Sequence, residues 1–248
     1  MSALAGWRPA AITFDFWNTL AFEEIGALAA RRHVAWLGLL EEAGIAVDPD
    51  QLWAAFGSAW EAHSAAWKDN RQYLADEAAA HALERLGVDV PDELATRLTA
   101  TFAGAGEGFE LRLTSGIEGC LRALAGAGVK LGIVCDVGFT AGVHLRAFLD
   151  RRGLLPLFDG WAFSDEVGVY KPAAGAFRHA LEQLGGVPAE EAAHVGDLKR
   201  TDIAGARAFG MRAIRYVGVF DDADGDGPEG DLVLADHAEL PTVLGLAA

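Results

Sequence analysis

The feature that most constrains the fold of this 248-residue chain is an alternation of short apolar runs with helical patterns, which begins near residue 111. The runs KLGIVCD (130–136) and AAHVGD (192–197) are almost continuously apolar, which is typical of strands buried on both faces of a sheet. The segments between them carry apolar residues three and four positions apart, which indicates amphipathic helices. This alternation predicts a parallel sheet covered by helices on both faces, with AAITFD (10–15) as its first strand.

Two local patterns predict where helices of this part begin and end. Ser115 and Glu118 have the spacing of a capping box, so we expect them to close the start of the helix that follows. Gly210 comes immediately before the apolar segment MRAIRYV (211–217). We therefore expect Gly210 to end a helix in the left-handed conformation that glycine adopts at low cost.

Residues 22–108 have a different pattern, because helical periodicity continues there without an apolar strand. One predicted face contains Ile25, Leu28, Trp36, Leu39 and Leu40. A second stripe, expected to form the interior of this part, consists of Trp53, Phe56, Trp60, His63 and Trp67. We therefore predict an all-α insert at 22–108 within a sheet domain formed by 1–21 and 109–248.

The composition excludes some partners and favours others. A net charge of −16, from 36 acidic and 20 basic residues, argues against nucleic acid, because phosphate backbones are bound by clustered Lys and Arg. No apolar run reaches the roughly 18 residues of a membrane-spanning helix, and MSALAGWRPA (1–10) lacks the apolar region of a secretory signal. Two cysteines cannot form a disulfide framework, so a cytoplasmic protein is expected.

Polar residues stand where predicted strands end or helices begin, and parallel strands bring such positions to one edge of a sheet. They are Asp15, Cys135, Asp136, Lys171 in YKPAAGAF, and Asp197 and Asp202 in GDLKRTD. Carboxylates are the ligands that Mg²⁺ prefers, and a divalent metal lowers the repulsion between a carboxylate nucleophile and a phosphate. This edge is therefore a candidate site for phosphoryl chemistry.

The order and spacing of these motifs, together with the helical insert, resemble the haloacid dehalogenase-like hydrolase superfamily, whose helical C1-type cap the insert resembles. The resemblance implies a Rossmann-like three-layer α/β sandwich with an inserted all-α cap. It also implies that Asp15 is the nucleophile and that Lys171 pairs with it and stabilises charge on the transferring group. Cys135, Asp136 and Thr19 fall at positions that the family uses for substrate binding.

The same resemblance implies an Mg²⁺ site. Its ligands are expected to be the carboxylates of Asp15 and Asp197 and the backbone carbonyl of Trp17. Asp202 also belongs to the expected metal set. It is expected to lie behind the direct ligands, or to hold either a metal-bound water or Lys171.

Three positions depart from the family pattern. Trp17 replaces the carboxylate that protonates the leaving group, and loss of a general acid–base typically costs about 10²–10⁴-fold in rate. Cys135 replaces a phosphate-binding Ser or Thr, and a thiol is a weaker donor. Asp136 stands where Asn is common, which adds negative charge.

These departures leave three functions open. An Mg²⁺-dependent phosphatase of a small phosphorylated metabolite is favoured, because the chain keeps Asp197 and Asp202. A metal-independent dehalogenase is the first alternative, since those relatives carry an aromatic residue at the position of Trp17 and a halide leaves without a proton. A catalytically weak binding protein is the second. Further hypotheses are a substitute acid from the insert, His63 or Lys68, and a homodimer formed through the apolar insert.

Overall fold

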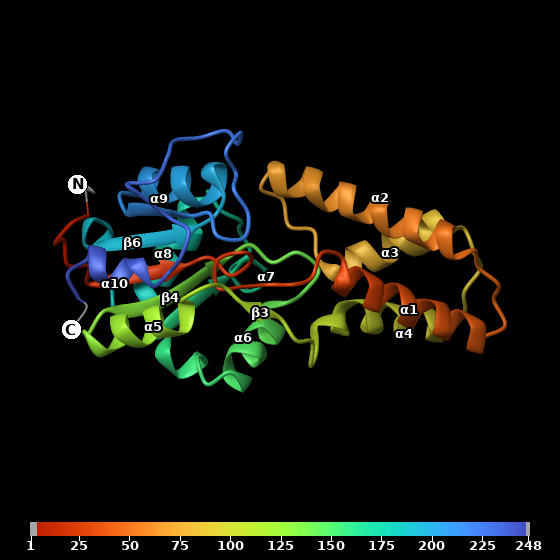
Figure 1. The fold of residues 1–248 in the computed structure, drawn as a ribbon. Coiled ribbons are helices and arrows are strands. Elements are labelled where there is room, and N and C mark those ends of the chain that lie inside the picture. The colour runs from red at the N-terminus through yellow and green to blue at the C-terminus, as the bar shows by residue number, and fades with distance from the viewer. Residues whose placement is uncertain (1–3, 247–248) are drawn as a thin grey trace. The chain divides into compact units, whose positions relative to one another are not determined.

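The computed structural model describes residues 4–246, which form two compact units (Figure 1). The first unit consists of the chain up to Phe22, Leu111–Asp136 and the chain from Leu149 onward. The second consists of Glu23–Glu110 and Val137–Phe148. The segment 137–148 therefore belongs with the helical unit, whereas the sequence placed it with the sheet.

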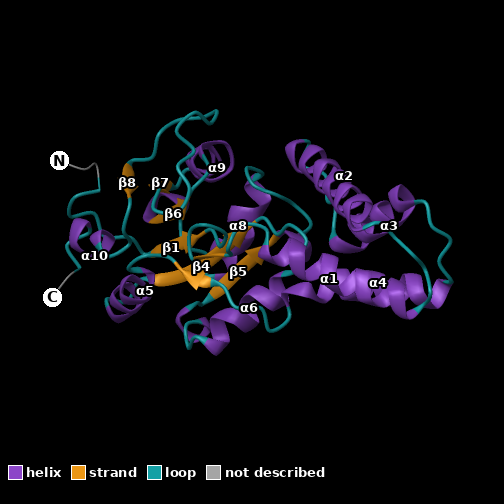
Figure 2. Ribbon diagram, turned by 45° about the vertical axis from the view of Figure 1, so that its right-hand side comes forward, coloured by secondary structure: helices purple, strands orange, loops and turns teal. Residues whose placement is uncertain are grey.

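Within residues 4–246 the first unit contains a six-stranded sheet whose neighbouring strands are all parallel (Figure 2). The strand order is β5-β4-β1-β6-β7-β8. The strands are β1 (Ala11–Phe14), β4 (Lys130–Cys135), β5 (Gly160–Phe163), β6 (Ala192–Gly196), β7 (Arg212–Tyr216) and β8 (Leu232–Leu234). The predicted parallel sheet is confirmed, and its order reverses direction at β1, where ligands of such sheets bind.

Helices cover both faces of this sheet. They are α5 (Ile117–Gly126), α7 (Ser164–Val167), α8 (Ala174–Gln183), α9 (Ala204–Phe209) and α10 (Glu239–Val243), with a π-helical turn at Lys199–Ile203 and 3₁₀ turns at Leu155–Leu157 and Ala189–Glu191. Ala11 of β1 packs in one apolar cluster with Phe177 of α8. Phe14, three residues on, contacts His237, which precedes α10. Because successive strand side chains point to opposite faces, α8 and α10 lie on opposite sides of the sheet.

A short antiparallel ribbon, β2 (Ala21–Phe22) with β3 (Arg112–Leu113), lies where the chain leaves and re-enters the first unit. Helix α6 (Gly142–Arg151) begins in the second unit and ends in the first. No helix in the described part of the chain is long and apolar enough to cross a membrane.

The two helix ends predicted from local patterns have different outcomes. Gly210 ends α9 with φ 97°, as expected. The predicted capping box is wrong: α5 starts after Gly116, and no side chain caps it. Ser115 Oγ instead donates to Asp236 Oδ2 at 2.7 Å, and Glu118 pairs with Arg122. The Ser115 hydroxyl, which the local pattern predicted to cap the helix, thus donates to Asp236, a residue 121 positions away in the chain.

The second unit is formed by α1 (Ala27–Glu42), α2 (Pro49–Lys68), α3 (Ala75–Leu86) and α4 (Asp92–Ala103), with a 3₁₀ turn at Gly104–Gly106. Trp36, Phe56 and Phe102 form its aromatic centre, with ring centroids 5.1–5.9 Å apart. Phe139 joins this centre through Phe102, and Arg32 donates to the carbonyl of Phe139 at 2.8 Å. These contacts explain why segment 137–148 belongs to the helical unit.

The predicted interior stripe of the insert is partly wrong. Trp53 and Trp60 of α2 are 40% and 53% exposed. On the other predicted face, Ile25 is also misplaced, because it lies before α1 and is fully exposed. The buried face of α2 consists of Leu52, Ala55, Phe56, Ala59, His63 and Ala66. The packed face is therefore rotated from the tryptophan stripe, and it presents small alanines through which helices can approach closely.

Candidate active site

Asp15 is buried at the carboxyl end of the central strand β1. Asp136 and Asp197 follow β4 and β6 directly, and these strands flank β1. Parallel register therefore brings three carboxylate-bearing positions to one edge of the sheet, as the sequence predicted. The whole cluster belongs to the first unit.

Lys171, in the turn between α7 and α8, connects two of the aspartates. Its Nζ lies 2.5 Å from Asp15 Oδ1 and 2.6 Å from Asp202 Oδ1, and all three side chains are buried. The Lys171 backbone N–H donates to Asp136 Oδ1 at 2.8 Å. Asp136 therefore fixes the backbone that carries Lys171, a contact that the sequence analysis did not assign to it.

Asp202 lies in the π-helical turn after β6, and hydrogen bonds occupy both of its oxygens. Oδ1 accepts from Lys171 and faces His194 Nε2 at 3.1 Å, while Oδ2 accepts from the Leu198 backbone N–H at 2.9 Å. Of the roles expected for Asp202, this arrangement favours holding Lys171. The sequence analysis missed His194, whose only signal was one ionisable ring within the apolar run AAHVGD.

Asp197 is buried, and Asn18 Nδ2 donates to its Oδ2 at 3.3 Å. Asn18 has φ 57°, a left-handed conformation that Asn tolerates better than most residues. This backbone turn follows Trp17 and is closed by the Asn18 N–H, which donates to the Ala21 carbonyl at 2.9 Å. Asn18 is a second residue that sequence reasoning did not select.

Burial and mutual repulsion set the charges of the carboxylates. Burial raises the pKa of Asp15 to about 7 against the opposing pull of Lys171, and the charge of Asp202 raises it further. Burial likewise holds the pKa of Asp197 well above its usual range, helped by Asp202 and Asp15. For Asp202, Lys171 and His194 outweigh the effect of burial and lower the pKa. The aspartates outweigh burial at Lys171 and raise its pKa well above the ordinary value.

The chemistry of these donors fits a hard divalent cation. Asp15 and Asp197 are buried carboxylates whose pKa values are both raised, and the charge of Asp15 contributes to the raised pKa of Asp197, so a cation beside them would relieve a repulsion that Lys171 alone does not cancel. Among residues 4–246, no three His, Cys, Asp or Glu side chains are grouped so as to hold a metal by themselves. Backbone carbonyl and water oxygens would therefore have to complete the coordination, which is a usual arrangement for Mg²⁺.

The positions expected to bind substrate have different environments. Cys135 is buried, and burial raises the pKa of its thiol well above the ordinary value, so it is not a thiolate nucleophile. Thr19 is also buried, and its hydroxyl has no hydrogen-bond partner within the described residues. The Thr19 carbonyl accepts from Thr114 Oγ1 at 2.7 Å and faces His237 Nε2 at 2.8 Å.

Trp17 is half-buried, and its ring meets that of Phe16 edge-on at 5.4 Å. The side chain offers no carboxylate to a leaving group. In the second unit, His63, the hypothetical substitute acid, is buried, and its Nδ1 lies 3.1 Å from the Tyr73 carbonyl. Burial lowers the pKa of His63.

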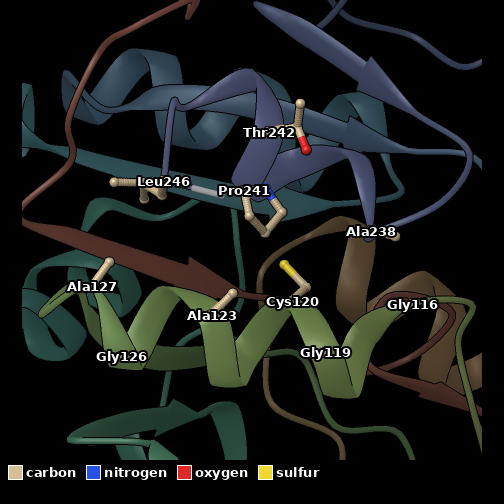
Figure 3. Close-up of a pocket in the computed structure, with 10 residues that line it drawn as sticks. All are labelled: Gly116, Gly119, Cys120, Ala123, Gly126, Ala127, Ala238, Pro241, Thr242 and Leu246. Carbon is tan, nitrogen blue, oxygen red and sulfur yellow. The ribbon is translucent and has the colours of Figure 1, made fainter. Parts of the chain in front are cut away.

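A separate cavity of about 590 Å³ lies between α5 and α10 (Figure 3). Its lining is small and apolar, with Cys120 and Pro241 facing one another from the two helices (Figure 3). None of the residues of the aspartate cluster lines it. It therefore plays no part in the chemistry described above.

The model of the haloacid dehalogenase-like hydrolase family matches residues 9–210. The chain therefore belongs to this family of hydrolases. Phosphatases of the family generally use Mg²⁺ and act on small phosphorylated substrates.

Curated relatives match part of the chain. A glyceraldehyde 3-phosphate phosphatase of Methanocaldococcus jannaschii is 34% identical over 109 residues, which are 43% of this chain and 45% of that protein. The pyrimidine 5'-nucleotidase YjjG of Escherichia coli is 38% identical over 96 residues, 39% of this chain and 41% of the relative. The chain thus matches less than half the length of these two relatives.

Solved structures match the chain over nearly its full length. A 2-haloacid dehalogenase from Pseudomonas syringae pv. tomato has a TM-score of 0.66 and 26% identity, covering 95% of this chain and 97% of the other. The putative hydrolase YfnB from Bacillus subtilis has a TM-score of 0.68 at 19% identity, covering 96% and 99%. At that identity the second comparison supports the fold alone.

Proposed function

We propose that this chain is an Mg²⁺-dependent phosphatase that acts through an Asp15 nucleophile on a small phosphorylated metabolite. The observation that carries the proposal is the Asp15 carboxylate, held at 2.5 Å by Lys171 beside the buried Asp197. Relatives named as phosphatases support the same class of reaction. A cytoplasmic location and a homodimer stay predictions.

The carboxylates of Asp15 and Asp197 and the carbonyl of Trp17 would hold the cation. When bound, Mg²⁺ supplies positive charge that lowers the repulsion between carboxylate and phosphate. Asp202 is not a direct ligand in this proposal, because its oxygens accept hydrogen bonds from Lys171 and Leu198 and face His194.

The reaction of the chain's own residues has two displacements. Asp15 Oδ attacks phosphorus, a bond from that oxygen to phosphorus forms, and the bond to the leaving oxygen breaks. Water then attacks the phosphorylated Asp15, which releases inorganic phosphate and restores the carboxylate. In both steps the Lys171 ammonium stabilises the negative charge on the phosphoryl oxygens.

Trp17 restricts the substrates for which the first displacement is fast. An alkoxide leaves poorly without a proton, and the indole cannot supply one from the position where the family has a carboxylate. Aryl and acyl phosphates release weakly basic anions, so they need this proton less. We therefore propose that good leaving groups are preferred.

The test is hydrolysis of an aryl phosphate and of acetyl phosphate, with Mg²⁺ and after chelation. We expect turnover only with Mg²⁺, loss of it in Asp15→Asn, and retention in Asp224→Asn, an exposed aspartate in the loop after β7. Absence of turnover on both phosphates in the wild-type chain would contradict the proposal.

A dehalogenase is the second candidate, favoured by the aromatic Trp17 and by the structural likeness to a 2-haloacid dehalogenase. Chloride release from a 2-chloroacid after chelation of metals would establish it. The phosphatase ranks first because the chain keeps a second buried carboxylate, Asp197, which accepts from Asn18 and is near enough to Asp15 for that charge to raise its pKa; displacement of a halide does not require this second carboxylate.

A further inference from the structure

A chain of buried hydrogen bonds continues from the aspartate cluster into the sheet. His194 in β6 stands directly across the parallel pair from Thr13 in β1. Thr13 Oγ1 lies 2.9 Å from His194 Nδ1, and His194 Nε2 lies 3.1 Å from Asp202 Oδ1. Both Thr13 and His194 are fully buried. The chain therefore connects β1, two residues before Asp15, to the carboxylate that holds Lys171.

The chemistry of the partners fixes the direction of these hydrogen bonds. The ionised Asp202 carboxylate can only accept, so His194 Nε2 must carry the hydrogen. In a neutral imidazole the other nitrogen, Nδ1, is then an acceptor. The Thr13 hydroxyl oxygen lies 2.9 Å from Nδ1 and 3.4 Å from the Ala193 carbonyl, so its hydrogen is donated to the nearer acceptor, Nδ1. The position of His194 thus requires the neutral tautomer with hydrogen on Nε2. Its Nε2 donates to Asp202, and its Nδ1 accepts from Thr13.

The hydrogen bond from His194 Nε2 restricts the orientation of the Asp202 carboxylate. Three donors hold this carboxylate: the Lys171 ammonium, the His194 ring and the Leu198 backbone N–H. His194 belongs to the central strand β6, whereas Lys171 lies in the turn between α7 and α8. Without His194, the Leu198 N–H would still hold Oδ2, but Oδ1 would lose the donor that the sheet positions beside Lys171.

We propose that His194 is a positioning residue: through Asp202 it fixes Lys171 Nζ against Asp15 in the geometry that the reaction needs. The inference rests on the proposed phosphatase function and adds a residue to it. His194 is fully buried, so it would act through its hydrogen bond to Asp202. Loss of a buried hydrogen bond to a charged group is expected to lower activity about 10–100-fold.

Two substitutions separate the hydrogen bond from the packing of the ring. His194→Phe keeps an aromatic ring against Phe177, whose centroid lies 5.2 Å away edge-on, but loses the donor. His194→Gln keeps an N–H near the position of Nε2 and loses the ring. We expect kcat for an aryl phosphate to fall about 10–100-fold in His194→Phe and to stay within about threefold in His194→Gln.

The stability of the two variants should follow the opposite order, with His194→Gln unfolding at the lower temperature. If kcat follows stability instead, so that the Phe variant is the more active one, His194 is only a packing residue and the proposal is wrong. His179→Gln, a half-buried histidine on α8, is the matched control and should change neither kcat nor stability.

A spectroscopic measurement makes the inference independent of turnover. Long-range ¹H–¹⁵N correlation of the imidazoles, assigned with His194→Gln, should show His194 with hydrogen on Nε2 and not on Nδ1. The opposite tautomer would overturn the proposal even in an active enzyme. If the wild-type chain hydrolyses no phosphate, the proposed function fails while this tautomer still decides whether His194 holds Asp202.

Discussion

At the scale of the residue, the site depends on the close approach of Asp202 to β6. A Cβ placed on Gly196 would lie 2.3 Å from Asp202 Cγ and 2.7 Å from its Oδ1. Because Gly196 has no side chain, the Asp202 carboxylate can occupy this space, where it contacts Lys171. The glycine before Asp197 is thus required by packing, not by backbone conformation.

Gly196→Ala tests this requirement. We expect the added methyl group to displace Asp202, to release Lys171 from Asp15, and to lower phosphatase kcat by at least about tenfold. Overpacking of this kind also costs about 1–3 kcal/mol of unfolding free energy, which denaturant unfolding would measure. Gly119→Ala, on α5 where a Cβ meets nothing within 4 Å, is the control and should leave both values unchanged or slightly improved.

Trp17→Asp tests the role of the indole. Restoring a carboxylate should accelerate hydrolysis of alkyl phosphates by about 10²-fold or more relative to aryl phosphates, because only the former need a proton on the leaving group. The ratio of kcat/KM for a matched alkyl and aryl pair is the measurement. An unchanged ratio would mean that another group already protonates the leaving oxygen.

At the scale of the element, the segment before α10 is attached to the turn after β1. His237 faces the Thr19 carbonyl at 2.8 Å and stacks on Tyr216 of β7, with ring centroids 4.0 Å apart. A carbonyl only accepts, so His237 Nε2 carries hydrogen. Burial lowers the pKa of His237 to about 4, because the charged ring would lose its hydration.

This shift predicts a pH-dependent contribution to stability. The pKa of His237 is lower in the folded state than its ordinary 6.5, so the contribution is complete above pH 6.5 and is lost as the pH falls from 6.5 to about 4. His237→Phe should lose less unfolding free energy than the wild type between pH 7.5 and 4.5, by roughly 2–3 kcal/mol. Chemical unfolding at both pH values measures the difference. Equal losses in the two proteins would contradict a buried neutral His237.

Helix α2 offers a second test at this scale. Phe56 is buried in the aromatic centre, whereas Trp53 on the same helix is 40% exposed and stacks on His33. Phe56→Ala should cost about 3–5 kcal/mol, as core aromatic truncations do, and Trp53→Ala less than half of that. Urea unfolding monitored by far-ultraviolet circular dichroism measures the free energy of unfolding of both variants. A larger loss in Trp53→Ala than in Phe56→Ala would indicate that the tryptophan stripe forms the interior after all.

At the scale of the whole molecule, negative charge dominates both the surface and the site. The chain carries a net charge of −16, and its candidate site buries three aspartates around one lysine. When the chain folds without a cation, the carboxylates of Asp15 and Asp197 are therefore buried near one another, and the pKa values of both are raised. A bound divalent ion should for this reason stabilise the fold as well as the reaction.

Thermal unfolding with and without Mg²⁺ tests this coupling. At a concentration of 100 times the dissociation constant, a ligand that binds only the folded state adds about 2.7 kcal/mol. We expect Mg²⁺ to raise the Tm of the wild type and of Asp224→Asn, but not of Asp197→Asn. In the absence of metal, Asp197→Asn should have a higher Tm than the wild type, because one buried charge is removed. A Tm of the wild type that does not respond to Mg²⁺ would contradict a metal at this site.

The sequence by itself determined the sheet, because continuous apolar runs have one stable arrangement, buried between helices. It also predicted that Asp15, Asp136 and Asp197 would lie at one edge, since strand ends on one sheet share an edge, and the family resemblance added Lys171 and Asp202 to this group. These inferences depend on local pattern and on the geometry of parallel strands, both of which can be read along the chain.

Only the tertiary structure decided which partner each polar group takes. Ser115 bonds to Asp236 and not to its own helix, and the register between β1 and β6 brings Thr13 to His194, which no local pattern specifies. The buried face of α2 was decided in the same way, by where small residues allow close helix packing. Hydrogen-bond partners and packed faces depend on residues far apart in the chain, so their choice is fixed only when the whole fold has formed.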